Sequence, residues 1–136
     1  MKGISFKPNI EAQFRNNHPS MGWDILENCV KEHLPEYEWW IFDEWKGTNI
    51  GVGCCNIMVA KPKVLNQWWE WAFPKIFAIN SQIPYESKKY STKYQGRAAG
   101  FISERLFMFW IYYQRVKGMK VQEVPRTFKR DLVVIA

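Results

Sequence analysis

An α/β or α+β fold is predicted by three features of this sequence. Segments with apolar residues at helical spacing alternate along the chain with short apolar runs that are typical of strands. Glycine and proline separate these segments, and no internal repeat or low-complexity stretch occurs. The chain has 136 residues, of which 47% are apolar and 24% charged, so its size and composition suit one globular domain.

The amino-terminal part predicts an extended segment followed by two helices. Two prolines and an asparagine-rich stretch favour an extended chain over residues 1–19. Ser20 fits the N-cap of a helix over residues 21–33, whose apolar residues share one face. Pro35 then fits the first turn of a shorter helix that ends near Trp45.

The middle of the chain predicts a strand, a helix and a long loop. Residues 52–60 form an almost continuous apolar run, which favours a strand buried on both faces. Pro62 begins a third helical pattern, and Pro74 should kink or interrupt it. Residues 81–95 are mostly polar and predict a loop long enough to serve a function.

The strongest helical pattern covers residues 94–115. Its apolar residues form two stripes, and residues 106–113 are apolar without a break, so this helix should be covered nearly all round. Gly118 fits the cap that ends it. A second strand is predicted over residues 121–124, and residues 128–135 can add a third.

Three charged residues fall in the first turns of this helix: Arg97, Glu104 and Arg105. Charges at the start of a buried helix need partners, because an unpaired buried charge is costly. Glu104 could pair with an arginine and only stabilise the fold. It could also act as a general base, with the arginines facing an anionic group. The residues alone leave both interpretations open.

Three further polar residues are candidates for a binding site. Asp24 lies one helical turn or so beyond His18, and the two could form a pair that supports such a site. Asn56 places an amide inside the apolar run, where it either bonds to neighbouring backbone or points at a ligand. Neither histidine belongs to a cluster with metal-ligand spacing, so no metal site is predicted.

Composition narrows the classes of partner. The net charge of +6 comes from lysines and arginines that never form a run of five or six, so we interpret it as a solvated surface. Nucleic-acid binding is therefore not expected. Eight tryptophans, six tyrosines and nine phenylalanines can form a thick core, a surface that stacks on carbohydrate, or a face for a partner.

The cysteines and the first residues bear on localisation. Cys29, Cys54 and Cys55 are odd in number and have no zinc-ligand spacing, which favours free thiols in a reducing compartment. The first residues lack the apolar core of a secretory signal, and no apolar run is long enough to form a transmembrane segment. We expect a cytoplasmic protein, either free or at the inner membrane surface.

Seven segments in a fixed order carry a family resemblance. They are Gln13-Phe14, His18, Trp23-Asp24-Ile25-Leu26, Pro35-Glu36-Tyr37, Cys55 to Lys61, Glu70-Trp71-Ala72-Phe73-Pro74, and Gly96 to Leu106. This series resembles the carboxy-terminal half of an uncharacterised-domain family of bacterial glycosyltransferases in capsular polysaccharide and O-antigen biosynthesis. The resemblance spans residues 13–128 and leaves residues 1–12 as an extended lead-in. Gly-Arg-x-x-Gly-Phe-x-Ser-Glu-Arg-Leu is its most specific motif.

The resemblance implies a fold, a reaction and a set of site residues. The fold would be a partial GT-A-like layer of a few mostly buried strands, packed by three or four helices. The reaction would move a sugar from a nucleotide-sugar donor to a polysaccharide or lipid-linked acceptor. Glu104 would deprotonate an acceptor hydroxyl, Arg97 or Arg105 would neutralise a diphosphate, and Asn56 would bond to a sugar hydroxyl. His18 and Asp24 would assist substrate binding, and a divalent metal is implied by analogy only.

One departure from the family pattern supports an alternative function. Family members carry a preceding segment with the first nucleotide-binding strands, and residues 1–10 are not expected to supply them. Phe14 also stands where the family usually has tyrosine. The chain would then be a non-catalytic glycan-binding or protein-interaction module, with weak nucleotide binding. Its partners would be a missing amino-terminal half or further copies of itself.

Overall fold

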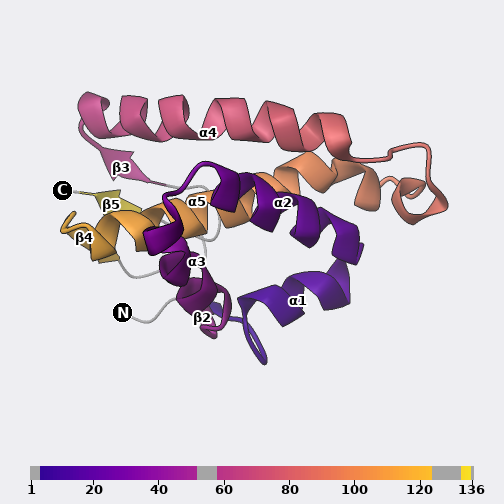
Figure 1. Cartoon of the computed structure of the whole chain (residues 1–136), viewed down its shortest axis with the longest axis horizontal. Helices are drawn as coiled ribbons and strands as arrows, with labels where there is room; N and C mark the ends of the chain where they lie inside the picture. Colours follow the sequence, from indigo (N-terminus) through magenta and orange to yellow (C-terminus); the bar gives the residue numbers. More distant parts are fainter. Residues whose placement is uncertain (1–3, 52–57, 124–132, 136) are drawn as a thin grey trace.

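The computed structural model describes residues 4–51, 58–123 and 133–135 (Figure 1). Its α-helices are α1 (Ile10–Asn17), α2 (Ser20–Glu32), α3 (Trp39–Lys46), α4 (Pro62–Gln82) and α5 (Ala98–Val116). Short 3₁₀ turns are η1 (Glu36–Glu38), η2 (Lys88–Tyr90) and η3 (Gln95–Arg97). The strands are β1 (Ile4–Ser5), β2 (Ile50–Gly51), β3 (Val59–Ala60), β4 (Val121–Glu123) and β5 (Val133–Ile135).

The described part of the chain is mostly helical, so the predicted α/β or α+β layer is wrong. Its strands have two or three residues each and pair only as β1 with β2 and in the order β3–β5–β4. Helices therefore pack on helices, and no GT-A-like layer of buried strands organises this core. Within the apolar run that suggested a buried strand, residues 58–60 are described, and Val59 of β3 is 52% exposed. Each apolar run that predicted a strand contains one described strand, but these strands have only two or three residues and cannot form the predicted layer.

Helix α5 is the element on which the others pack, as its unbroken apolar run predicted. It runs behind α2 and α3 in Figure 1, with α4 along one side. Phe107 meets Trp68 of α4 at 5.0 Å between ring centroids, and Phe109 meets Phe42 of α3 at 5.3 Å. Burying each such side chain contributes about 1.5–3 kcal/mol. Gly118, at φ +102°, ends the helix as predicted.

Helix α1 occupies residues that the sequence suggested were extended. Asn9 caps it, because its side-chain oxygen accepts a hydrogen bond from the Ala12 amide at 2.8 Å. Ile10 and Phe14, one turn apart, are both buried. The following helix is confirmed as α2, although Pro19 rather than Ser20 occupies its N-cap position.

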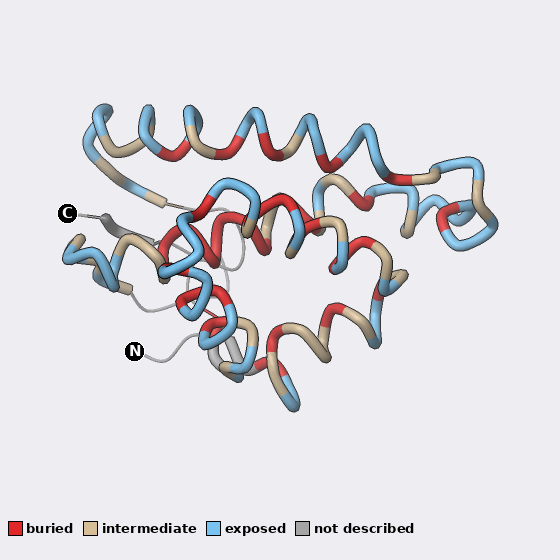
Figure 2. Tube along the Cα trace, in the orientation of Figure 1, coloured by how far each residue is buried: buried red, intermediate tan, exposed pale blue. Residues whose placement is uncertain are grey.

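Helix α4 continues through Pro74, so the predicted interruption does not occur. Pro74 lies on the exposed side, where the backbone carbonyl that loses its partner can be hydrated. Figure 2 shows the contrast along α4, with buried turns toward the other helices and exposed turns away from them. Ala72 and Ile79 are buried on either side of the proline and hold the helix against α2 and α5.

Lys75 is a buried cation on the inner side of α4. It is 6% exposed, and its ammonium donates to the carbonyl of Trp71 at 2.9 Å while lying 4.1 Å from the centre of that residue's ring. Burial lowers the pKa of Lys75 and raises that of Cys29, which faces it across the contact between α2 and α4.

Candidate functional site

The predicted site residues that the structure brings together lie where α1 faces the first half of α5. We call these residues and the side chains that contact them the α1–α5 cluster; its members are Gln13, His18, Tyr94, Gln95, Arg97, Phe101, Glu104 and Arg105. The chain reaches the cluster twice, at the end of α1 and at the turn into α5. Positions 97, 101, 104 and 105 recur at helical spacing, so α5 presents them on one side.

His18 forms the centre of an aromatic stack. Its ring lies 4.2 Å from that of Phe101 and 5.8 Å from that of Tyr94, with interplanar angles of 26° and 22°. The imidazole is 9% exposed, whereas Tyr94 is 54% exposed. The stack therefore extends from a buried histidine to a ring face at the surface.

A hydrogen-bonded link fixes the orientation of this histidine. Gln95 donates through Nε2 to the carbonyl of Asn17 at 2.8 Å, which leaves its Oε1 as the acceptor that lies 3.1 Å from His18 Nδ1. His18 Nδ1 must then carry the hydrogen, and Nε2 is the ring nitrogen that can accept. Burial, followed by the positive charge of Arg105, lowers the pKa of His18 and favours the neutral ring.

Arg105 is held firmly, at 5% exposure, and its charge reaches His18. Its Nη2 donates to Gln13 Oε1 at 2.8 Å, and its Nη1 lies 3.4 Å from Glu104 Oε2. The guanidinium carbon lies 5.9 Å from the ring centre of Phe6 and 5.3 Å from that of Phe14. Ring faces and an amide oxygen thus compensate for the removal of this cation from water.

Glu104 is held less firmly than its neighbour. Its side chain keeps 39% of its exposure, and its contact with Arg105 is long for a charge-assisted hydrogen bond. Burial raises the pKa of Glu104, and the charges of Arg105 and Arg97 only partly oppose that shift. The carboxylate is therefore accessible and more basic than an ordinary glutamate.

Arg97 completes the charged side of the cluster from the turn into α5. It is exposed, with its guanidinium carbon 5.7 Å from the ring centre of Phe101. Glu104 follows two helical turns later on the same side. The sequence-based grouping of Arg97, Glu104 and Arg105 is thus matched by their arrangement around one part of α5.

Two other predicted site residues do not join this group. Asp24 is paired with Arg15 at 2.6 Å, and its side chain is 61% exposed. The expected pairing of His18 with Asp24 is replaced by the contact of His18 with Gln95. Asn56 lies outside the described residues.

Gln13 and Gln95 belong to the cluster although the sequence analysis did not single them out as site residues. Gln13 begins the segments that carry the family resemblance, and this was the one available signal. Gln95 meets His18 across 77 positions of sequence, and no local pattern indicates such a contact.

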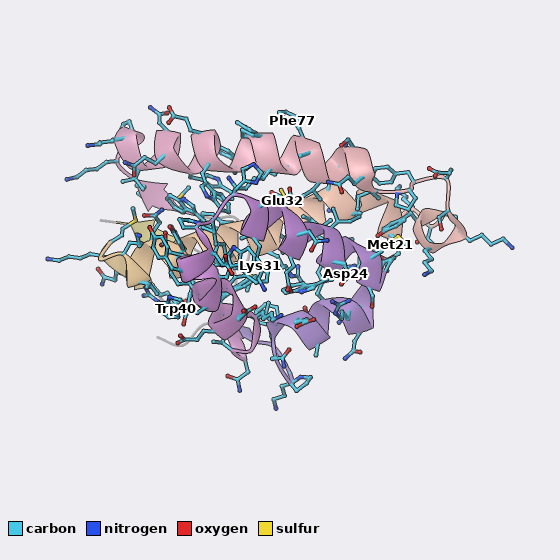
Figure 3. All side chains as sticks on the ribbon, in the orientation of Figure 1. Met21, Asp24, Lys31, Glu32, Trp40 and Phe77 are labelled. Atoms are coloured by element: carbon cyan, nitrogen blue, oxygen red, sulfur yellow. The ribbon has the colours of Figure 1, made fainter. Side chains whose placement is uncertain are left out.

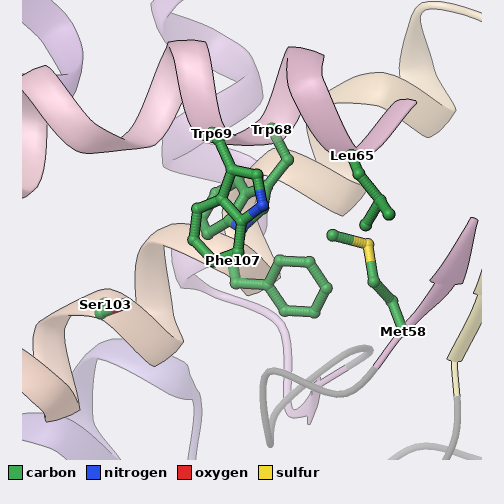
Figure 4. A pocket seen from close by; sticks show the side chains of 6 residues that line it. All are labelled: Met58, Leu65, Trp68, Trp69, Ser103 and Phe107. Atoms are coloured by element: carbon green, nitrogen blue, oxygen red, sulfur yellow. The ribbon is translucent and has the colours of Figure 1, made fainter. Parts of the chain in front are cut away.

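A cavity of about 250 Å³ lies on a different side of α5, toward α4 (Figure 4). It is lined by Met58, Leu65, Trp68, Trp69, Ser103 and Phe107. Ser103 supplies its one hydroxyl group, so the lining is mainly apolar. Glu104 follows Ser103 in sequence but is not part of this lining. A ligand in the cavity would therefore meet a different chemistry from one at the α1–α5 cluster.

Neither a metal-binding group nor a membrane-spanning helix is found in the described ranges. Over residues 4–51, 58–123 and 133–135, His, Cys, Asp and Glu do not gather in threes as a metal site would require. The same residues contain no helix that is both long enough and apolar enough to cross a bilayer.

Comparison with known proteins identifies the family at a coarse level. A family model described as a domain of unknown function, DUF4422, matches residues 2–115. Neither a curated protein nor a solved structure matches the chain. Because the matched residues include both α1 and α5, with the whole α1–α5 cluster, the chain belongs to the DUF4422 family.

Proposed function

We propose that this chain takes part in glycosyl transfer, in which a sugar moves from a nucleotide-sugar donor to a polysaccharide or lipid-linked acceptor. The observation that carries the proposal is the state of Glu104. It is an accessible carboxylate whose pKa is raised by burial, and two arginines lie beside it. A general base works best when its pKa approaches the working pH, and the shift of Glu104 is in that direction.

In the proposed step, the Glu104 carboxylate accepts the proton of an acceptor hydroxyl. The hydroxyl oxygen forms a bond to the anomeric carbon of the donor sugar. The bond from that carbon to the diphosphate oxygen breaks, and the nucleoside diphosphate leaves with the electron pair. The proton remains on Glu104 until the product departs.

The two arginines have different parts in this proposal. Arg97 is exposed and can place its guanidinium against the leaving diphosphate, where two parallel hydrogen bonds suit phosphate oxygens. Arg105 is buried against Gln13 and orients Glu104 instead. A sugar hydroxyl on Asn56 and a divalent metal at the diphosphate remain expectations from the family resemblance.

The aromatic stack favours a second candidate, a glycan-binding module that catalyses no transfer. Tyr94 is 54% exposed and rests on the rings of His18 and Phe101, so it offers a supported flat surface to a sugar. His18 Nε2 is oriented as an acceptor by Gln95. Binding of saccharide through these groups needs no general base.

Turnover and saccharide binding separate the two candidates. Nucleoside diphosphate release would be measured for a panel of nucleotide sugars with oligosaccharide acceptors. Glu104→Gln should reduce the rate by about 10²-fold or more, and the exposed Glu86→Gln serves as the control. Equal rates for both variants would contradict the proposed base. Oligosaccharide binding that Tyr94→Ala abolishes and Glu104→Gln preserves, without turnover, would favour the binding module.

A further inference from the structure

Three aromatic side chains form an exposed ridge along α4, and the ridge begins at Trp69 beside the cavity described above. This α4 ridge consists of Trp69, Phe73 and Phe77, which are 43%, 45% and 69% exposed. Successive ring centroids lie 4.9 and 6.0 Å apart, with interplanar angles of 13° and 18°. Figure 3 shows Phe77 on the side of α4 that faces away from the other helices. A continuous exposed aromatic surface of this kind indicates an interaction site.

The surface around the ridge carries almost no charge. From Trp69 to Gln82, Glu70 is the exposed charged residue, because Lys75 is buried on the opposite side of the helix. The other exposed positions hold small or neutral side chains: Pro74, Ala78, Asn80, Ser81 and Gln82. The occupant of this surface therefore contacts its centre through apolar groups.

Basic residues border the ridge at both ends. Lys61 and Lys63 stand at the beginning of α4. Beyond its end, the segment that leads to α5 exposes Lys88, Lys89 and Lys93 together with one acidic residue, Glu86. Residues 61–93 contain six basic and two acidic residues, and every basic residue among them except Lys75 is exposed. The partner that binds this surface must contact aromatic rings at the centre and carry negative charge opposite the lysines at both ends.

We propose that this face of α4 docks on an anionic bilayer surface. Aromatic rings settle at the boundary between headgroups and acyl chains, and lysines beside them contact lipid phosphates. This face of α4 suits both the acyl-chain boundary and the headgroup phosphates, because its uncharged ridge lies between two groups of lysines. The proposal stands apart from the transfer reaction, since none of the ridge residues belongs to the α1–α5 cluster.

A second copy of the chain fits the same face less well. If two α4 helices paired antiparallel, Lys61 and Lys63 of one copy would meet the basic segment after α4 of the other. A parallel pairing would bring identical basic ends together. Both arrangements place like charges opposite one another, which opposes association. An anionic surface instead attracts both ends.

The test is sedimentation of the chain with vesicles of phosphatidylcholine alone or mixed with phosphatidylglycerol. Binding should require the anionic lipid and weaken as salt is added. Phe73→Ser with Phe77→Ser should reduce binding by about tenfold or more. The matched control is Tyr37→Ser with Trp40→Ser, since these residues are 77% and 52% exposed outside α4.

Lysine variants test the border of the same face. Replacing Lys88, Lys89 and Lys93 by Gln should reduce binding by about fivefold for each residue, whereas Lys120→Gln should have little effect. Circular dichroism checks that each variant is folded. Equal binding to neutral and anionic vesicles would overturn the proposal, as would unchanged binding of the double phenylalanine variant. A dimer in light scattering that this variant dissociates would assign the ridge to self-association instead.

Discussion

Glu38 and Glu104 are two carboxylates that pair with basic residues in α5 or at its C-cap, and their environments differ. Near the end of α5, Glu38 Oε2 accepts hydrogen bonds from Lys117 and from the Tyr113 hydroxyl, both at 2.8 Å. Glu38 is 6% exposed, and these donors, led by Lys117, lower its pKa. Glu104, in the first half of the helix, has a 3.4 Å contact with Arg105 and a raised pKa.

This difference in hydrogen bonding and pKa indicates a structural role for Glu38 and leaves Glu104 as the candidate general base. At Glu38, the gain from two short hydrogen bonds exceeds the cost of burial, so the charged form is favoured. At Glu104, burial is only partly compensated, because Arg105 directs its shorter hydrogen bond to Gln13. The charge of Glu104 therefore adds little to the stability of the fold.

The largest effect is expected for Glu38→Ala. It removes two charge-assisted hydrogen bonds and should lower the free energy of unfolding by about 2 kcal/mol. Urea titration would measure the change. The neighbouring Glu36, which is exposed, supplies the control variant Glu36→Ala, with an expected change within about 0.5 kcal/mol. A change in the free energy of unfolding for Glu38→Ala as small as that for Glu36→Ala would contradict the structural role of Glu38.

A much smaller effect is expected for Glu104→Gln at neutral pH. The amide preserves shape, and Arg105 retains Gln13 and its packing against Phe14. The free energy of unfolding should change by less than about 0.5 kcal/mol, or rise slightly. A drop of about 3 kcal/mol or more would identify Glu104 as a structural partner of Arg105 and withdraw the proposed base.

The smallest effect is a pH dependence of opposite sign at the two sites. The pKa of Glu38 is lowered, so its stabilisation is present above the ordinary value of 4.5 and is lost as pH falls through its folded value. The pKa of Glu104 is raised, so its charge destabilises the fold at neutral pH, and that cost disappears as pH falls through its folded value toward 4.5.

Thermal melts of the unmodified chain, Glu38→Gln and Glu104→Gln measure this difference between pH 7 and pH 4. Glu38→Gln should lower the midpoint at pH 7 and matter less at pH 4. Glu104→Gln should raise the midpoint slightly at pH 7, with that gain vanishing at pH 4. Parallel changes for the two variants would show that both carboxylates have the same role.

Local patterns predicted the individual helices better than the arrangement between them. The apolar run of α5, the glycine that ends it and the helix after Pro19 follow from residues a few positions apart. Helix α1 was missed because the capping role of Asn9 depends on one short hydrogen bond. The fold class was wrong because the runs predicted as strands contain strands of only two or three residues, while the helices supply most of the core.

The candidate site divides in the same way. Helical spacing placed Arg97, Glu104 and Arg105 together, because Arg97 directly precedes α5 and the other two residues belong to it. The partners that distinguish them come from α1, and Arg105 meets Gln13 across 92 positions of sequence. Burial raises the pKa of Glu104 and the charge of Arg105 lowers it, while the shorter hydrogen bond of that arginine goes to Gln13. The sequence alone does not show that Gln13 and Glu104 share Arg105 as a partner.

Because the amine of Lys75 is buried, its chemical labelling would report when the contact between α2 and α4 opens. Reagents that modify amines reach the exposed lysines directly, but they reach Lys75 only when α4 separates from α2. Cys29 lies on the other side of that contact and is also buried. An amine reagent and a thiol reagent should therefore report the same local opening, each from one helix. Together they would measure how often α4 leaves the rest of the molecule without global unfolding.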